Sequence, residues 1–268
     1  MPHYLSLFYY LLLIFYITSF NPVLSGRFTT EDPASWTGIW FPEKPSSLTK
    51  QEKVKSETKS RPMGEKNPDC DDGKTNLSID WNGALQDYIC LNPRNRFFPN
   101  ASIHSKIEYE NIPKLYMAPH FCMQMSIEYK SKLPTFGPHR PLWPKYGEYK
   151  YVPKQRWLHT LEHGGIVALY HPCADLSEIK LLKKVVKGCL RRHVITPTSD
   201  LTPERPFALV AWGVRFTMPT VNVMDVQRFI KEHALQGPEK LADEGQYEFL
   251  LLKEAKIISD FNDSRLCP

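Results

Sequence analysis

Two strand patterns with a helix between them constrain the fold of this chain more than any other feature. Residues 166–170 (IVALY) and 207–212 (FALVAW) are continuous apolar runs of the kind that forms buried strands. Between them, Asp175 caps a predicted helix over 176–190, which has one apolar face and carries the basic residues of 183–192 on a face that we expect to be solvated. This order predicts a crossover in which the two strands are parallel and lie adjacent or one strand apart.

Shorter elements fill the rest of the globular sequence. Alternating or Pro-punctuated segments at 122–129 and 147–152 predict short strands and loops, and residues 193–206 predict a loop rich in Pro and Thr. Residues 225–235 predict a further helix that ends at a Gly-Pro pair. We therefore expect an α+β fold: a single small mixed sheet with a strand-helix-strand crossover and a short histidine-bearing helix, supported by disulfides.

The histidine-bearing helix contains the run His159-Thr-Leu-Glu162-His163, in which two imidazoles stand one helical turn apart beside a carboxylate. Pro153 suits the first turn of a helix and the glycine pair after His163 suits its end, so we predict a helix over 153–163. At 100° per residue, both histidines and Glu162 fall on its polar face. That face is either solvated or presents its side chains to a metal ion.

Further histidines support metal binding, because five of the nine in the chain lie between positions 120 and 171. Imidazole is the commonest metal ligand, and zinc sites need three or four ligands. We expect His159 and His163 to bind one ion together with His139 and, as a fourth ligand, His120. Glu162 would orient an imidazole or lie beside the ligands. Four nitrogens would close a zinc site, whereas copper(II) favours a tetragonal arrangement, so both ions stay open.

The N-terminal segment predicts entry into the secretory pathway. Residues 4–20 are almost wholly apolar, and the small-residue site Val23-Leu24-Ser25 follows, a layout typical of a signal peptide. If the segment is not cleaved, it would anchor the chain in a membrane. Three N-glycosylation sequons, at Asn76, Asn100 and Asn262, agree with this route. We expect a secreted or lumenal glycoprotein, with anchoring through the N-terminal segment as the alternative.

Composition divides the chain into four parts. Residues 1–25 are the predicted signal peptide, and residues 26–75, rich in Lys, Glu, Ser and Pro, are a largely disordered linker. Residues 76–236 form the globular histidine-rich domain, and residues 237–268 a weakly packed C-terminal extension. The formal net charge is only +5, without a basic stripe interleaved with aromatic residues, so we expect no nucleic-acid partner.

All six cysteines lie beyond the predicted cleavage site, and an even number in an oxidising compartment predicts disulfides. Six cysteines allow 15 connectivities. One pair is excluded, because Cys173 precedes the helix of 176–190 and Cys189 ends it, about 20 Å away at 1.5 Å per residue. A disulfide requires Cα atoms within about 7 Å.

Several motifs together resemble a known family. They are His120, Tyr129, PTFGPH at 134–139, GEY at 147–149, LHTLEHG at 158–164 and AWG at 211–213. Over roughly positions 115–218 this combination resembles the domain of unknown function family 3105, found in bacterial membrane-anchored or exported proteins and in eukaryotic relatives. The resemblance implies membrane association and, from one eukaryotic relative, a growth-suppressor role. It assigns no chemistry.

Three hypotheses for function follow. The first is a secreted domain that binds a transition metal through its clustered histidines. The second is a metal-dependent hydrolase in which Glu162 is the general base for a metal-bound water. The third is a metal-free extracellular interaction module for an unknown protein partner, whose recognition surface would use Phe136, Trp143, Tyr146, Tyr149, Trp157 and Trp212. An enzymatic role is the less favoured reading.

Overall fold

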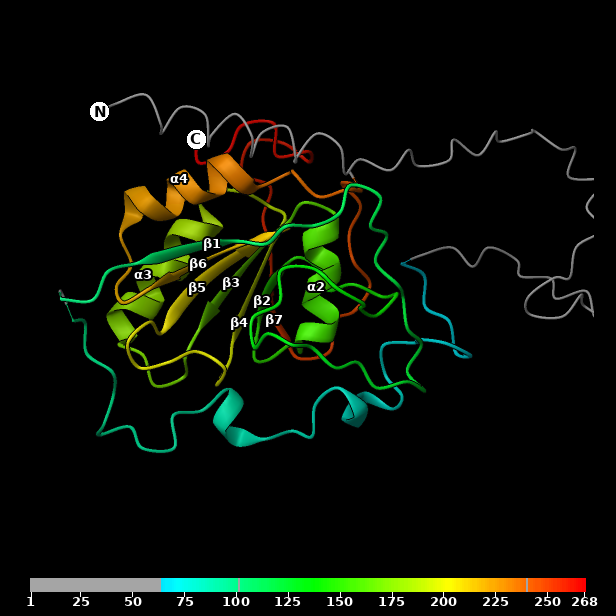
Figure 1. Cartoon of the computed structure of the whole chain (residues 1–268), viewed down its shortest axis with the longest axis horizontal. Coiled ribbons are helices and arrows are strands. Elements are labelled where there is room, and N and C mark those ends of the chain that lie inside the picture. The colour runs from blue at the N-terminus through cyan, green and yellow to red at the C-terminus, as the bar shows by residue number, and fades with distance from the viewer. Residues whose placement is uncertain (1–63, 101, 240) are drawn as a thin grey trace, which may run out of the picture. The chain divides into compact units, whose positions relative to one another are not determined.

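The computed structural model of the protein describes residues 64–100, 102–239 and 241–268. The predicted signal peptide and most of the predicted linker lie outside the described residues. In the described part of the chain, a seven-stranded mixed sheet has helices on both faces (Figure 1), which confirms the α+β class.

The elements are the 3-10 helices η2 (Leu77–Ile79) and η3 (Leu85–Asp87), strands β1 (Lys106–Tyr109) and β2 (Gly147–Tyr149), helix α2 (Lys154–Glu162), strand β3 (Ile166–Tyr170), helix α3 (Leu176–Lys187), strands β4 (His193–Pro197), β5 (Phe207–Ala211) and β6 (Val214–Met218), helix α4 (Val223–His233) and strand β7 (Leu251–Glu254).

The strands lie in the order β1-β6-β5-β3-β4-β2-β7. The predicted strands β3 and β5 are adjacent, but they are antiparallel, so the predicted parallel pairing is wrong. The parallel crossover exists one strand earlier, because α3 returns the chain to β4, which pairs with β3 in parallel. Strand β4 lies at the start of the segment that we predicted to be a loop. It is short, it follows two arginines and it ends in a proline, so its few apolar residues give no clear strand pattern.

The two faces of the sheet are covered by different helices (Figure 1). One core cluster joins α3 and α4 to side chains such as Ile166, Ile195 and Leu209. The second joins α2 to the opposite face of the same strands, through Val167, Val194 and others. Strands buried on both faces read as continuous apolar runs, which is why β3 and β5 could be recognised.

Helix α3 begins as predicted, with the Asp175 carboxylate accepting hydrogen bonds from the backbone N–H groups of Ser177 and Glu178. Its basic end differs from the prediction. Arg191 and Arg192 are 3% and 6% exposed, and they donate to carboxylates and carbonyls of the C-terminal segment instead of facing water. His193, at the start of the predicted loop, is buried in β4.

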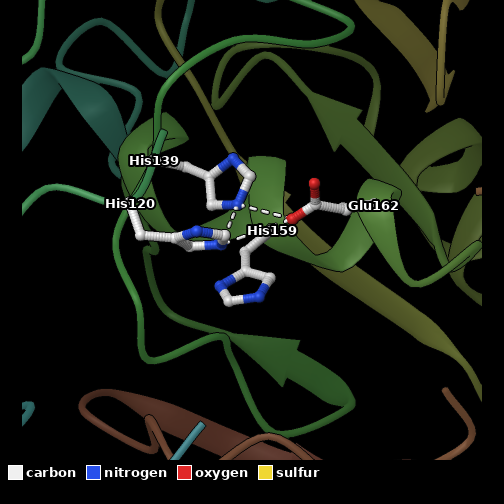
Figure 2. Close-up of side chains that lie close together, drawn as sticks. All are labelled: His120, His139, His159 and Glu162. Carbon is white, nitrogen blue, oxygen red and sulfur yellow. Dashed lines mark hydrogen bonds and ion pairs between the residues drawn. The ribbon is translucent and has the colours of Figure 1, made fainter. Parts of the chain in front are cut away.

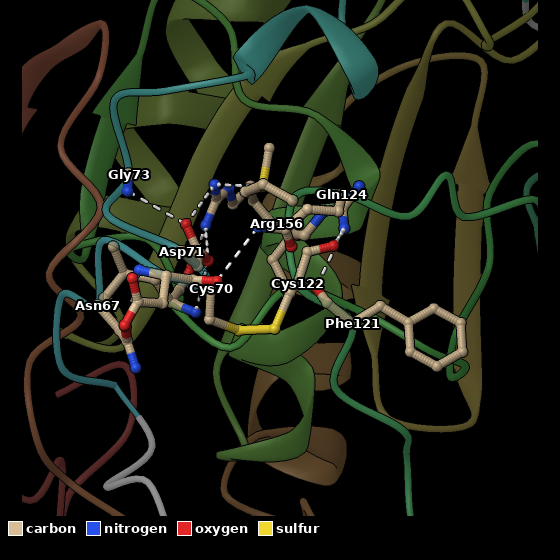
Figure 3. The surroundings of a disulfide bond; sticks show 12 residues. Asn67, Cys70, Asp71, Gly73, Phe121, Cys122, Gln124 and Arg156 are labelled. Carbon is tan, nitrogen blue, oxygen red and sulfur yellow. Dashed lines mark hydrogen bonds and ion pairs between the residues drawn. A yellow bond between two sulfur atoms is a disulfide. The ribbon is translucent and has the colours of Figure 1, made fainter.

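The segment from residue 64 onward packs against the domain, although the sequence analysis placed residues up to 75 in the linker. Cys70 is bonded to Cys122, and the Asp71 carboxylate pairs with the fully buried Arg156 of α2 (Figure 3). No periodic pattern in the sequence predicts this packing, because a disulfide, ion pairs and hydrogen bonds hold the segment rather than an apolar face.

A strand and a disulfide attach the C-terminal segment to the domain. Strand β7 pairs with β2 at one edge of the sheet. Cys267 is bonded to Cys189, so the extension of residues 237–268 is joined to the domain at two places. Cys173 and Cys189 are not bonded to each other, as predicted; the three disulfides are Cys70–Cys122, Cys90–Cys173 and Cys189–Cys267.

Candidate metal centre

Four side chains from two extended segments and one helix converge beside α2. His120 and His139 lie on neighbouring segments joined by a parallel bridge, in which Phe121 N–H donates to the His139 carbonyl at 2.9 Å. His159 and Glu162 are three residues apart on α2, so both project from the same side of that helix. Figure 2 shows the four side chains pointing toward one another.

The donor atoms of this cluster are close enough to hold one metal ion. One ligand atom from each of His120, His139, His159 and Glu162 lies within 4.8 Å of all the others. Nε2 of His139 is 3.0 Å from Nε2 of His120 and 3.0 Å from Oε2 of Glu162. The third side of this triangle, from His120 Nε2 to Glu162 Oε2, measures 3.4 Å.

Backbone carbonyls orient two of the imidazoles. Nδ1 of His139 lies 2.9 Å from the Gly137 carbonyl, and Nδ1 of His159 lies 2.7 Å from the Arg140 carbonyl. A carbonyl only accepts, so each Nδ1 carries the proton and, in the neutral ring, each Nε2 is left with its lone pair. Nε2 of His159 has no hydrogen-bond partner among the described residues, although it is buried.

The cluster is shielded from water on most sides. His139 and His159 are fully buried and Glu162 is 4% exposed, whereas the His120 side chain is 19% exposed. Burial lowers the pKa of His139 and of His159. Burial alone would raise the pKa of Glu162, but the adjacent imidazoles of His120 and His139 outweigh it and lower the pKa to about 2. At pH 7 His139 and His159 are therefore neutral and Glu162 is ionised, which is the state that binds metal.

His163 lies beside this cluster but is not part of it. Its ring is 4.7 Å from that of His159 and 4.4 Å from that of Trp143, measured between centroids. Its Nδ1 is 3.6 Å from Oε2 of Glu239. Burial lowers the pKa of His163 to about 4. The structure thus brings together three of the four predicted histidines, with Glu162 rather than His163 as the fourth side chain of the cluster.

The polar face of α2 is not solvated. Arg156, His159, Glu162 and His163 are all at most 4% exposed, so the alternative of a solvated face is wrong. The sequence could not reveal this burial, because the groups that cover the face come from loops that lack periodicity. The cysteines near the site are all in disulfides and offer no thiolate.

The aromatic residues considered for a recognition surface are mostly core residues. Trp143, Tyr146, Tyr149 and Trp157 are at most 4% exposed. Phe136 and Trp212 are half-buried and pack with Tyr116, at ring centroid distances of 5.2 Å and 6.4 Å from it.

Fold and site together define a disulfide-supported α+β domain with a histidine-glutamate cluster that could hold a metal ion. Residues 120–246 match the model of the family described as "Protein of unknown function (DUF3105)". This confirms the resemblance to that family, and the matched range contains all four clustered side chains. No curated protein and no solved structure matches the chain. Among the described residues, none of the helices has the length and apolar character needed to cross a membrane.

Proposed function

We propose that the protein binds one transition-metal ion through His120, His139, His159 and Glu162. The main support for this proposal is a group of buried hydrogen-bond acceptor atoms that face one another. Nε2 of His139 carries a lone pair, because its Nδ1 proton is directed to the Gly137 carbonyl, yet it lies 3.0 Å from a carboxylate oxygen of Glu162. Burial lowers the pKa of His139, so the ring is neutral at pH 7. Two acceptors at this distance repel each other unless a cation lies between them. A metal ion would satisfy both, and it would also use the unpartnered Nε2 of His159.

The spacing supports an ion of the size of zinc or copper. With bonds of about 2.0–2.1 Å, ligands at the corners of a tetrahedron are about 3.3 Å apart. The triangle of His120, His139 and Glu162 has sides of 3.0, 3.0 and 3.4 Å, and a donor atom of His159 lies within 4.8 Å of these three. Nitrogen donors with one carboxylate oxygen suit zinc, and copper(II) accepts the same donors in a flatter arrangement. We propose zinc first and copper second.

The arrangement of the four donors favours a site that binds a metal ion over one that catalyses hydrolysis. A catalytic zinc keeps one position open for water, whereas four protein donors close the coordination sphere. Glu162 would be the general base of the hydrolase alternative, but its Oε2 is directed at two imidazoles, which suits a ligand. We therefore assign Glu162 as a ligand, and His163 as a buried neighbour that packs against His159.

We also propose that the protein works outside the cytosol, in the secretory lumen or after secretion. Three disulfides persist in oxidising compartments. The sequon residues Asn100 and Asn262 are exposed, as a glycan requires. Deletion of residues 1–25 should abolish glycosylation of the expressed chain; equal glycosylation with and without this segment would contradict secretion through it. The growth-suppressor role implied by the resemblance is not part of this proposal, because no contact in the structure supports it.

Elemental analysis of the full chain, produced through the secretory route and purified without chelators, tests the metal proposal. We expect one zinc or copper ion per chain. The double variant His139→Ala/His159→Ala should carry none, because it lacks two buried donors. His104→Ala is the matched control, since His104 is an exposed histidine outside the cluster, and it should keep the full metal content.

Equal metal content in the wild type and the double variant would refute the site. Turnover of peptide or ester substrates by the metal-loaded protein, lost in Glu162→Gln, would replace the binding function by the hydrolase. Absence of stoichiometric metal from the wild type under all loading conditions would favour the metal-free interaction module.

A further inference from the structure

Arg140, the residue after His139, contacts the segments that carry the other histidines of the cluster. The Arg140 side chain is fully buried, and its guanidinium forms a two-point ion pair with Asp80, whose side chain is 2% exposed. Nε of Arg140 lies 2.9 Å from Oδ2 of Asp80. A buried guanidinium needs such a counter-charge, because an unpaired charge in the interior is strongly destabilising.

The same guanidinium holds the loop that follows His120. Nη1 of Arg140 donates to the carbonyls of Phe121 and Cys122 at 3.0 Å and 2.6 Å, and Nη2 donates to the carbonyl of Met125 at 2.8 Å. Three backbone acceptors of one loop are thus fixed by one planar group. Phe121 directly follows His120, so the position of the His120 imidazole depends on this contact.

The main chain of Arg140 reaches the third histidine. Its carbonyl accepts the Nδ1 proton of His159 at 2.7 Å, and its N–H donates to the Gln155 carbonyl in the first turns of α2 at 2.8 Å. Arg140 therefore neighbours His139 in the chain, holds the loop of His120 through its side chain, and orients His159 through its carbonyl.

We propose that the Asp80–Arg140 pair is the positioning device of this metal site. The inference rests on the proposed metal binding. Asp80 fixes the guanidinium, and the guanidinium sets the distance between the His120 loop and the segment that carries His139 and orients His159. Asp80 precedes the range matched by the family model, which begins at residue 120, so the metal site of this chain depends on a residue outside that range.

Metal affinity of the full-length, disulfide-bonded protein tests the proposal. Co²⁺ is the probe, because its visible absorption reports the geometry of its ligands, and competition with a chelator gives the zinc affinity. Asp80→Asn removes the counter-charge, and Arg140→Lys keeps the charge but loses the planar fork that spans three carbonyls. Each variant should bind zinc about 10–100-fold more weakly, as loss of a group that orients ligands usually does, with a changed Co²⁺ spectrum.

Asp71→Asn is the matched control. It breaks the other buried pair, with Arg156, whose side chain is also fully buried. Arg156 contacts the loop of His120 only through the Met123 sulfur, a weak acceptor, and neither residue of this pair bonds the carbonyl that orients His159. Its zinc affinity in the folded state and its Co²⁺ spectrum should stay close to those of the wild type.

The outcomes separate the two proposals. A wild type that binds neither ion would refute the proposed function itself. A wild type that binds zinc, with Asp80→Asn and Arg140→Lys binding equally well, would refute only the positioning role. Equal weakening in Asp71→Asn would also refute it, because the effect would then follow from stability alone. We expect the variants to fold, since three disulfides hold the domain; failure of both Asp80→Asn and Arg140→Lys to fold would make the pair a general structural requirement and overturn the proposal.

Discussion

The buried ion pair between Asp71 and Arg156 allows a direct test of how the segment around residue 70 is held on the domain. Both side chains are at most 1% exposed. The Asp71 carboxylate accepts from Arg156 Nη2 at 2.8 Å and from the N–H groups of Leu142 and Gly73 at 3.1 Å each, besides its contact with Nη1 of Arg156 (Figure 3). Asparagine has nearly the same shape, so Asp71→Asn removes the charge with little change in volume.

The expected cost is about 3–5 kcal/mol of unfolding free energy, the usual effect of leaving one partner of a buried pair uncompensated. The contacts that remain for Arg156 support the size of this effect. They are the Leu142 carbonyl at 3.0 Å, the sulfur of Met123 at 3.2 Å and the ring of Tyr247, none of which carries a negative charge. Since a domain has about 5–15 kcal/mol of net stability, Asp71→Asn removes a large share of it.

Urea denaturation with the disulfides intact measures this cost. Asp69→Asn is the control, because Asp69 is exposed, and it should change stability by no more than about 0.5 kcal/mol. The double variant Asp71→Leu/Arg156→Met should recover part of the loss, since apolar groups of similar size replace a buried pair at little cost. A loss below about 1 kcal/mol in Asp71→Asn, at an unchanged denaturant slope, would show that the carboxylate does not compensate the buried guanidinium.

Three further predictions concern the core, the acid stability and the C-terminus. Leu182→Ala in the fully buried face of α3 should cost about 2–5 kcal/mol in denaturant unfolding; a cost of a few tenths would refute the packing of α3 on the sheet. Burial lowers the pKa of His193 to about 4, below its value of 6.5 in the unfolded chain, so its contribution is complete above pH 6.5 and is lost as the pH falls through 4. In metal-free protein, replacement of His193 by Phe should therefore remove about 3 kcal/mol of the stability difference between pH 7 and pH 4, whereas an unchanged pH profile would contradict its burial as a neutral ring. Replacing Cys189 and Cys267 together by serine should cost about 2–5 kcal/mol and expose the C-terminal segment to proteases; protease resistance equal to that of the wild type would show that β7 holds the segment without the disulfide.

The elements that the sequence predicted correctly are those whose residues repeat with a clear period. Strand β3 was placed at its observed bounds, because it is a continuous apolar run. Helix α3 was placed at its observed start, because it has an N-cap and a regular apolar face, but it ends three residues earlier than predicted. The parallel pairing of β3 and β5 was wrong for a physical reason. Strand β4 comes between them in the chain as a five-residue element, and its insertion reverses the direction in which the chain returns to β3.

The candidate site was predictable in part. The spacing of His159 and Glu162 identified the helix, and the number of histidines nearby suggested His120 and His139 as partners. The choice between Glu162 and His163 as the fourth donor could not be made from spacing, because both lie within one helical turn of His159. It depends on the direction of the loops that carry His120 and His139, and these loops have no periodic pattern from which a direction can be inferred.

Burial of the polar face of α2 is the feature that best connects the fold with the proposed function. A helix usually turns its polar face to water, because burying polar groups costs free energy unless each group finds a partner. On α2 two of these groups find partners outside the helix: Asp71 for Arg156, and the Arg140 carbonyl for Nδ1 of His159. The Glu162 carboxylate faces the Nε2 atoms of His120 and His139. Nε2 of His159 still has no partner among the described residues. An apolar side chain at position 159 would avoid that cost, so its imidazole, beside three other donors, is best explained by a ligand that uses the lone pair.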